Sequence, residues 1–173
     1  MQDSYIEEIV KCNPPSTAGA TKVLMIIMCF ASIFVWFVPV LGMIATAVCI
    51  GLTVWVFRNF DYEYEYTYTE NTLDVDKIIA KSGRKKLGSF DFSRLELMAP
   101  VNSQEALRLE RADYKTYDYR SNTEGAKVYV AYPMLDNAVV RVLFEPSEKL
   151  CNAIEYSAPR KVIRYSDESA ERE

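Results

Sequence analysis

The chain has 173 residues and a formal net charge of −4, so its overall charge gives no electrostatic basis for binding nucleic acid. It contains no histidine and therefore lacks the side chain that most often serves as a general base or a metal ligand. Two of its four cysteines, Cys29 and Cys49, lie in an apolar stretch and no Cys-x-x-Cys pair occurs, which argues against a disulfide scaffold and a cysteine zinc site.

The N-terminal segment, residues 1–19, does not resemble a signal peptide. Its opening residues include Asp3, Glu7 and Glu8 and no basic residue, whereas a signal peptide begins with a basic region. We therefore expect the apolar stretch that follows it to remain in the mature protein.

An uncharged apolar stretch covers residues 23–57. As a single helix it would be about 50 Å long, whereas the hydrocarbon core of a bilayer is about 30 Å thick. Pro39 and Gly42 lie near its middle, where they favour a reversal of the chain. We therefore predict a two-helix transmembrane hairpin over residues 20–57. The alternative is a single tilted or kinked crossing, which would place the rest of the chain opposite the N-terminus.

The hairpin also predicts an orientation. Both termini would lie on one side of the membrane, together with every lysine and arginine of the chain. The positive-inside rule assigns that side to the cytoplasm, so we expect a multi-pass protein of the cell membrane with both termini cytoplasmic. No ionisable side chain lies within the apolar stretch, so a transport pathway is not expected. Small residues that could bring the two helices close together are Ala31, Ser32, Gly42, Ala45, Ala47 and Gly51.

Residues 58–165 are predicted to form a mainly-β cytoplasmic domain. Tyr alternates strictly with Glu or Thr over residues 62–69, which is typical of a strand, and a second alternating run follows. A two-residue turn at Glu70-Asn71 would pair Tyr68 with Leu73. This register keeps the apolar side chains on one face of the hairpin and the acidic side chains on the other.

Two further hairpins and one strand are expected in the middle of the domain. The hairpins would turn at Ser82-Gly83 and at residues 135–137, and the strand would cover residues 114–120. Residues 102–112 fit either a short helix or a long loop.

The chain is expected to end in one amphipathic helix. Pro146 can open this helix, Pro159 ends it, and Leu150 and Ile154 share one face at helical spacing. The last residues, 166–173, form a polar tail that we expect to be disordered. Six to seven antiparallel strands followed by such a helix is the order of a pleckstrin-homology-like (PH-like) barrel, in which the helix closes an open end.

Two segments, residues 73–81 and residues 144–161, resemble an uncharacterised family of small membrane proteins from Gram-positive bacteria. The likeness extends over nearly the full chain and implies no assigned activity. Residues 62–86 also resemble the early strands of bacterial PH-domain-like membrane proteins, which carry a two-helix membrane hairpin just before the domain. This second likeness is one of architecture, which does not fix a function.

One face of the first predicted β-hairpin carries four carboxylates, for which two interpretations are open. Hard cations prefer carboxylate oxygens, so the cluster could form a weak Ca²⁺ or Mg²⁺ site. Flat strands rarely surround an ion, so the cluster could instead be the solvated face of a hairpin that faces nearby cations. We favour the second interpretation and predict no metal site and no cofactor. The four residues are Glu63, Glu65, Asp74 and Asp76.

Two basic clusters are the candidate contacts with lipid or a protein partner. Near a bilayer, each such cation contributes about 1 kcal/mol of attraction to anionic headgroups. The alternatives are a soluble hairpin tip for the first cluster and compensation of the final helix's dipole for the second. The first cluster is Lys81, Arg84, Lys85 and Lys86, and the second is Arg160 and Lys161.

The tyrosines of residues 62–68 are expected to pack mainly in the core rather than to form a binding platform. No Gly-x-x-x-x-Gly-Lys, Gly-x-Gly-x-x-Gly or Gly-x-Ser-x-Gly motif occurs, so we predict no catalytic residue and no enzyme. The favoured function is a membrane-anchored interaction module that binds a protein partner, the anionic membrane surface or other copies of itself. The alternatives are a small accessory subunit of a larger membrane complex and, less favoured, an unrecognised enzyme acting on lipid.

Overall fold

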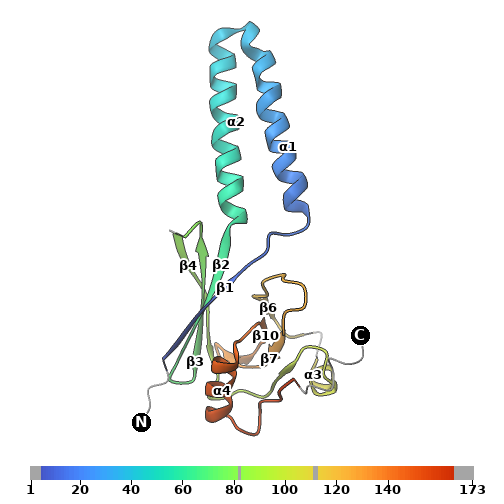
Figure 1. Cartoon of the computed structure of the whole chain (residues 1–173). Coiled ribbons are helices and arrows are strands. Elements are labelled where there is room, and N and C mark those ends of the chain that lie inside the picture. The colour runs from blue at the N-terminus through green and yellow to red at the C-terminus, as the bar shows by residue number, and fades with distance from the viewer. Residues whose placement is uncertain (1–4, 82, 111–112, 166–173) are drawn as a thin grey trace.

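The computed structural model describes residues 5–81, 83–110 and 113–165, with the backbone alone at residues 35, 36 and 39. Two antiparallel helices extend from one end of a β domain (Figure 1). Helix α1 covers Thr17–Ser32 and continues into the 3₁₀ helix η1, Ile33–Phe37. Helix α2 covers Pro39–Phe60, with the proline in its first turn, where the missing N–H costs nothing. The chain therefore reverses where the sequence predicts.

The two helices pack along a seam of heptad-like spacing. Two polar contacts cross this seam: Ser32 Oγ lies 3.2 Å from Thr46 Oγ1, and Cys29 Sγ lies 3.3 Å from Thr53 Oγ1. Most other side chains of the hairpin are apolar and exposed. Of the six small residues predicted to bring the helices together, Ser32, Gly42 and Ala45 are buried or half-buried, whereas Ala31, Ala47 and Gly51 are exposed.

The segment before the helices is a strand of the β domain. Strand β1, Ile6–Lys11, pairs antiparallel with strand β2, Tyr62–Thr69, which follows α2. Lys11 lies opposite Glu63, so the two ends of the helical hairpin are held together by the sheet. The prediction of a separate N-terminal segment over residues 1–19 is therefore wrong for this strand. Its partner lies beyond the whole helical hairpin, and its Ile-Glu-Glu-Ile pattern does not alternate, so no local signal marks it.

The first β-hairpin has the predicted register. Strand β3, Thr72–Ile79, pairs with β2 so that Tyr68 lies opposite Leu73. Glu70 and Asn71 have φ angles of 49° and 64°, as a two-residue type I′ turn requires.

The next turn falls earlier than predicted. Strand β4, Gly83–Asp91, pairs with β3 so that Ile79 lies opposite Gly83. Positive φ angles at Ala80 and Lys81 reverse the chain before Gly83 rather than at it.

The third hairpin turns at Asp136-Asn137, whose φ angles are 50° and 63°, within the predicted loop. Its tip is formed by β8, Met134–Leu135, and β9, Ala138–Val139, which complete a six-stranded sheet in the order β1-β2-β3-β4-β8-β9. Its base is formed by β7, Tyr129–Ala131, and β10, Arg141–Phe144, which belong to a second sheet.

The second sheet has the order β5-β7-β10-β6, with β5 at Met98–Pro100 and β6 at Thr116–Asp118. Strand β6 is parallel to β10. The prediction of one barrel of six to seven antiparallel strands was therefore wrong in its detail. Within the described residues there are ten strands in two sheets, no ladder joins the sheets into a closed barrel, and the third hairpin passes from one sheet to the other.

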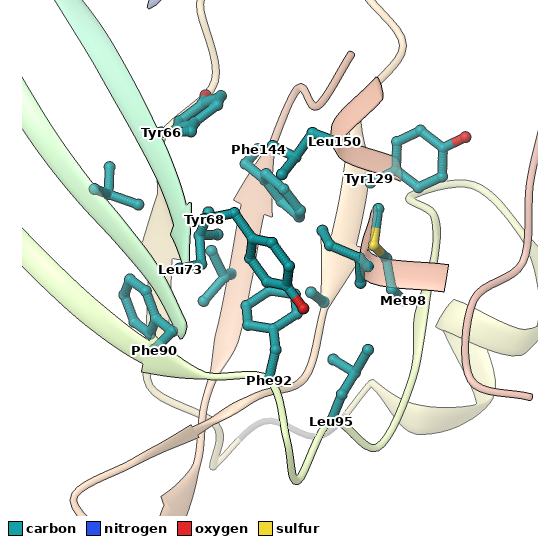
Figure 2. Close-up of a cluster of buried hydrophobic side chains, with 14 of the residues drawn as sticks. Tyr66, Tyr68, Leu73, Phe90, Phe92, Leu95, Met98, Tyr129, Phe144 and Leu150 are labelled. Carbon is teal, nitrogen blue, oxygen red and sulfur yellow. The ribbon is translucent and has the colours of Figure 1, made fainter. Parts of the chain in front are cut away.

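The main core lies between the two sheets and the final helix α4, Glu148–Ser157 (Figure 2). Tyr66 and Tyr68 point into it from β2, which confirms their predicted core role, while Tyr62 and Tyr64 are half-buried. Helix α4 begins after Ser147, whose hydroxyl caps it by accepting from the Leu150 N–H, so the helix starts slightly later than predicted.

A second, smaller core lies on the other side of the second sheet. Helix α3, Gln104–Leu109, packs on the other side of the second sheet, where the sequence allowed either a helix or a loop. The predicted tail, residues 166–173, lies outside the described residues.

Candidate functional site

The acidic face of the first β-hairpin is paired with the basic cluster of β4. Arg84 Nη2 lies 2.7 Å from Glu65 Oε2, and Arg84 Nη1 lies 3.9 Å from Asp76 Oδ2. Lys86 Nζ lies 3.0 Å from Asp74 Oδ1. Two of the four cations in the first basic cluster, Arg84 and Lys86, thus compensate three of the four carboxylates. In the described part of the chain, no group of three or more acidic or cysteine side chains could hold a metal ion.

Glu65 is the most enclosed of these carboxylates, because its residue is only 1% exposed. Burial raises the pKa of Glu65, and a hydrogen bond with the Glu7 carboxyl on β1 raises it further. A hydrogen bond from the Tyr5 hydroxyl lowers the pKa of Glu7. Burial would raise the pKa of Asp74, but hydrogen bonds from Ser89 and Lys86 hold it below its usual range. Ion pairs and hydrogen bonds within the domain therefore account for the acidic cluster without a bound metal ion.

The other basic side chains of this region, Lys77, Lys81 and Lys85, are placed differently from Arg84 and Lys86. Lys77 and Lys85 lie directly opposite each other on β3 and β4, on the tyrosine face of the sheet. Lys77 Nζ lies 3.8 Å from the centre of the Tyr62 ring. Among the described residues, no carboxylate forms an ion pair with Lys77, Lys81 or Lys85. Like charges opposite each other on neighbouring strands destabilise a sheet, so an anion placed between Lys77 and Lys85 would be favourable.

These lysines lie at the end of the domain from which the helices extend. Tyr62, at the start of β2, pairs with Ile79 at the end of β3, and the Ala80 N–H donates to the Asp61 carbonyl at 2.8 Å. The β3–β4 turn therefore lies level with the end of α2 at Phe60, as Figure 1 shows.

Arg160 and Lys161 lie at the opposite end of the domain. They follow α4, whose last residue, Ser157, places its hydroxyl 2.7 Å from the Tyr68 hydroxyl beside the β2–β3 turn. With neighbouring residues they line a shallow cavity of about 250 Å³. The two predicted basic clusters are therefore not brought together and could not contact one membrane surface at once.

Lys77 is not among the predicted contact residues. The available signal was its place in β3: the predicted register puts Lys77 opposite Tyr64 on the tyrosine face, away from the carboxylates.

One helix of the hairpin is long and apolar enough to cross a membrane. Residues 40–60 of α2 are long and apolar enough to cross a membrane, with a mean hydropathy of 2.3 and 11% of the most apolar part buried. Helix α1 is apolar but shorter. By length and composition, α2 supports association with a membrane.

A family model described as Bacterial PH-like domain (DUF6106) matches residues 2–164. The chain belongs to this family. The match includes both β1 and the helical hairpin, in agreement with the sheet that joins the segments before and after the helices. Neither the curated proteins nor the solved structures searched contain a match. A PH-like family suggests a binding module, and the fold alone does not name the ligand.

Proposed function

We propose that the protein is a membrane-anchored, non-enzymatic binding module of the cell membrane whose β domain rests against the anionic cytoplasmic surface. In this proposal α1 with η1 forms one crossing and α2 the other, and both termini are cytoplasmic. The observation that carries the proposal is the position of Lys77, Lys81 and Lys85, which form no ion pair with any described carboxylate and lie level with the end of α2.

The length of the hairpin supports the membrane part of the proposal. The 22 residues of α2 span about 33 Å at 1.5 Å per residue, close to the hydrocarbon thickness of about 30 Å. The exposed apolar side chains of both helices would be costly in water. Lys22 and Arg58 stand at the domain end of the hairpin, where the positive-inside rule requires cations on the cytoplasmic side.

The positions of Lys77, Lys81 and Lys85 support the proposed contact with the anionic membrane surface. A phosphate group between Lys77 and Lys85 would relieve the repulsion of two like charges, and Lys81 in the adjacent turn would add a third contact. Arg84 and Lys86 would add less, because their charges are offset by Glu65, Asp76 and Asp74.

Amine labelling of the full-length protein in lipid nanodiscs tests this function. In discs of phosphatidylcholine and phosphatidylglycerol, acylation of Lys81 and Lys85 should be several-fold slower than in discs of phosphatidylcholine alone, and high salt should remove the difference. Lys161, exposed at the far end, is the internal control. Equal rates in both lipids, or an equal change at Lys161, would contradict the surface contact.

A further inference from the structure

Strand β1 lies at one end of the six-stranded sheet, so one of its backbone edges is unpaired along the strand. The Cys12 N–H donates to the Tyr62 carbonyl, and antiparallel strands exchange hydrogen bonds at every second pair. Glu7, Ile9 and Lys11 therefore direct their N–H and C=O groups away from β2. In the described part of the chain no strand pairs with this edge. A loop covers only its end, where the Asn13 N–H donates to the Ser121 carbonyl at 2.7 Å.

Two large apolar side chains are exposed along this edge, next to the charged Glu7 and Lys11. Tyr5 is 59% exposed and Ile9 is 53% exposed, and both lie on the outer face on either side of Glu7. Outside the helical hairpin, the described residues include only two other large apolar side chains as exposed as these, Leu107 and Tyr156. Sheet edges are usually protected by charge or proline, and here the centre of the edge is an isoleucine.

We propose that this edge binds an extended segment of another protein, which adds a strand beside β1. The chemistry of the edge defines the segment: aliphatic or aromatic residues beside Tyr5 and Ile9, and a basic residue between them beside Glu7. Backbone hydrogen bonds would supply affinity, and the alternate side chains would supply specificity.

A second copy of the chain does not fit this edge, an argument that rests on the proposed membrane anchor. Symmetric antiparallel pairing of two β1 strands would point the two helical hairpins in opposite directions, so they could not enter one membrane. Symmetric parallel pairing would bring identical backbone groups level with each other, whereas a parallel ladder needs them staggered.

Photocrosslinking of the full-length protein in its own cells tests the proposal. With a benzophenone amino acid in place of Tyr5, which keeps an aromatic ring there and leaves Glu7 and Ile9 intact, a discrete adduct with another polypeptide is expected. Ile9→Val keeps the outward N–H and should keep the adduct. Ile9→Pro removes only an N–H that β2 does not use, so it should fold and should lower the yield of adduct by about fivefold or more.

Each outcome decides the proposal. An adduct that is kept in Ile9→Val and lost in a folded Ile9→Pro supports it. No adduct, an adduct insensitive to Ile9→Pro, or an adduct of the chain with itself would overturn it. If the melting temperature shows that Ile9→Pro is unfolded, Ile9→Lys replaces it, since a charge at the centre of the edge should also lower the yield. These readouts do not depend on Lys81 or Lys85, so failure of the edge proposal is distinguishable from failure of the lipid contact.

Discussion

The Arg84 guanidinium lies 2.7 Å from the Glu65 carboxylate, across β3. This contact joins two features that look separate in the sequence, an acidic strand face and a basic turn. It also divides the basic cluster by role, because Arg84 faces the carboxylates while Lys85 faces the tyrosine side of the sheet.

Arg84→Gln should destabilise the protein, because it leaves a buried carboxylate without its counter-charge. Arg84 is 60% exposed, so the loss should be about 1–2 kcal/mol rather than the larger cost of breaking a fully buried pair. Lys85→Gln, the neighbouring control, should change the free energy of unfolding little and should weaken contact with anionic lipid. Chemical unfolding in detergent measures both variants. Equal effects of the two substitutions on stability would contradict the division of roles.

Glu65→Gln should change how stability depends on pH. Because the folded-state pKa of Glu65 is raised above 4.5, the folded protein holds this proton more tightly than the unfolded chain. The contribution of this proton to the free energy of unfolding is therefore complete below about pH 4 and declines as the pH rises through the raised pKa. The variant cannot ionise, so its free energy of unfolding relative to the wild type should increase between about pH 4 and pH 7. A relative stability that is flat or falls over this range would show that the Arg84 charge outweighs burial.

Gly88→Ala should be poorly tolerated. A Cβ atom at this position would lie 2.6 Å from the Phe90 ring, at a β-bulge where the register shifts beside Val75. Overpacking of this kind costs about 1–3 kcal/mol. Gly83→Ala is the matched control on the same strand, since the nearest atom to its new Cβ would be 3.7 Å away. Thermal unfolding compares the two, and a Gly88→Ala variant as stable as Gly83→Ala would disprove the close packing.

Ile6→Ala and Ile9→Ala test whether β1 belongs to the domain. Ile6 is 7% exposed and packs in the core, so its truncation should cost about 2–4 kcal/mol. Ile9, on the same strand, is exposed and its truncation should cost little. Unfolding of the full-length protein in detergent provides the comparison. If both variants unfold like the wild type, β1 does not pair with β2 in solution.

Local patterns could predict some elements and not others. The β2–β3 register follows from a strict alternation and a two-residue turn, which are both local. The Glu65–Arg84 pair depends on where the next turn falls. A turn at Ser82-Gly83 would place Arg84 on the tyrosine face, because a shift of one residue moves every side chain of a strand to the other face. Strand β1 and the division into two sheets depend on partners far apart in sequence, which no local pattern records.

In the proposed arrangement the helical hairpin crosses the membrane and returns to the side on which the β domain lies. Labelling of intact cells with a membrane-impermeant maleimide tests it, in a variant whose native cysteines are replaced. A cysteine at position 40, in the hairpin tip, should react in intact cells. A cysteine at position 85 should react only after the membrane is permeabilised. If both positions react under the same condition, or if the protein is extracted without detergent, the membrane-anchored account is contradicted.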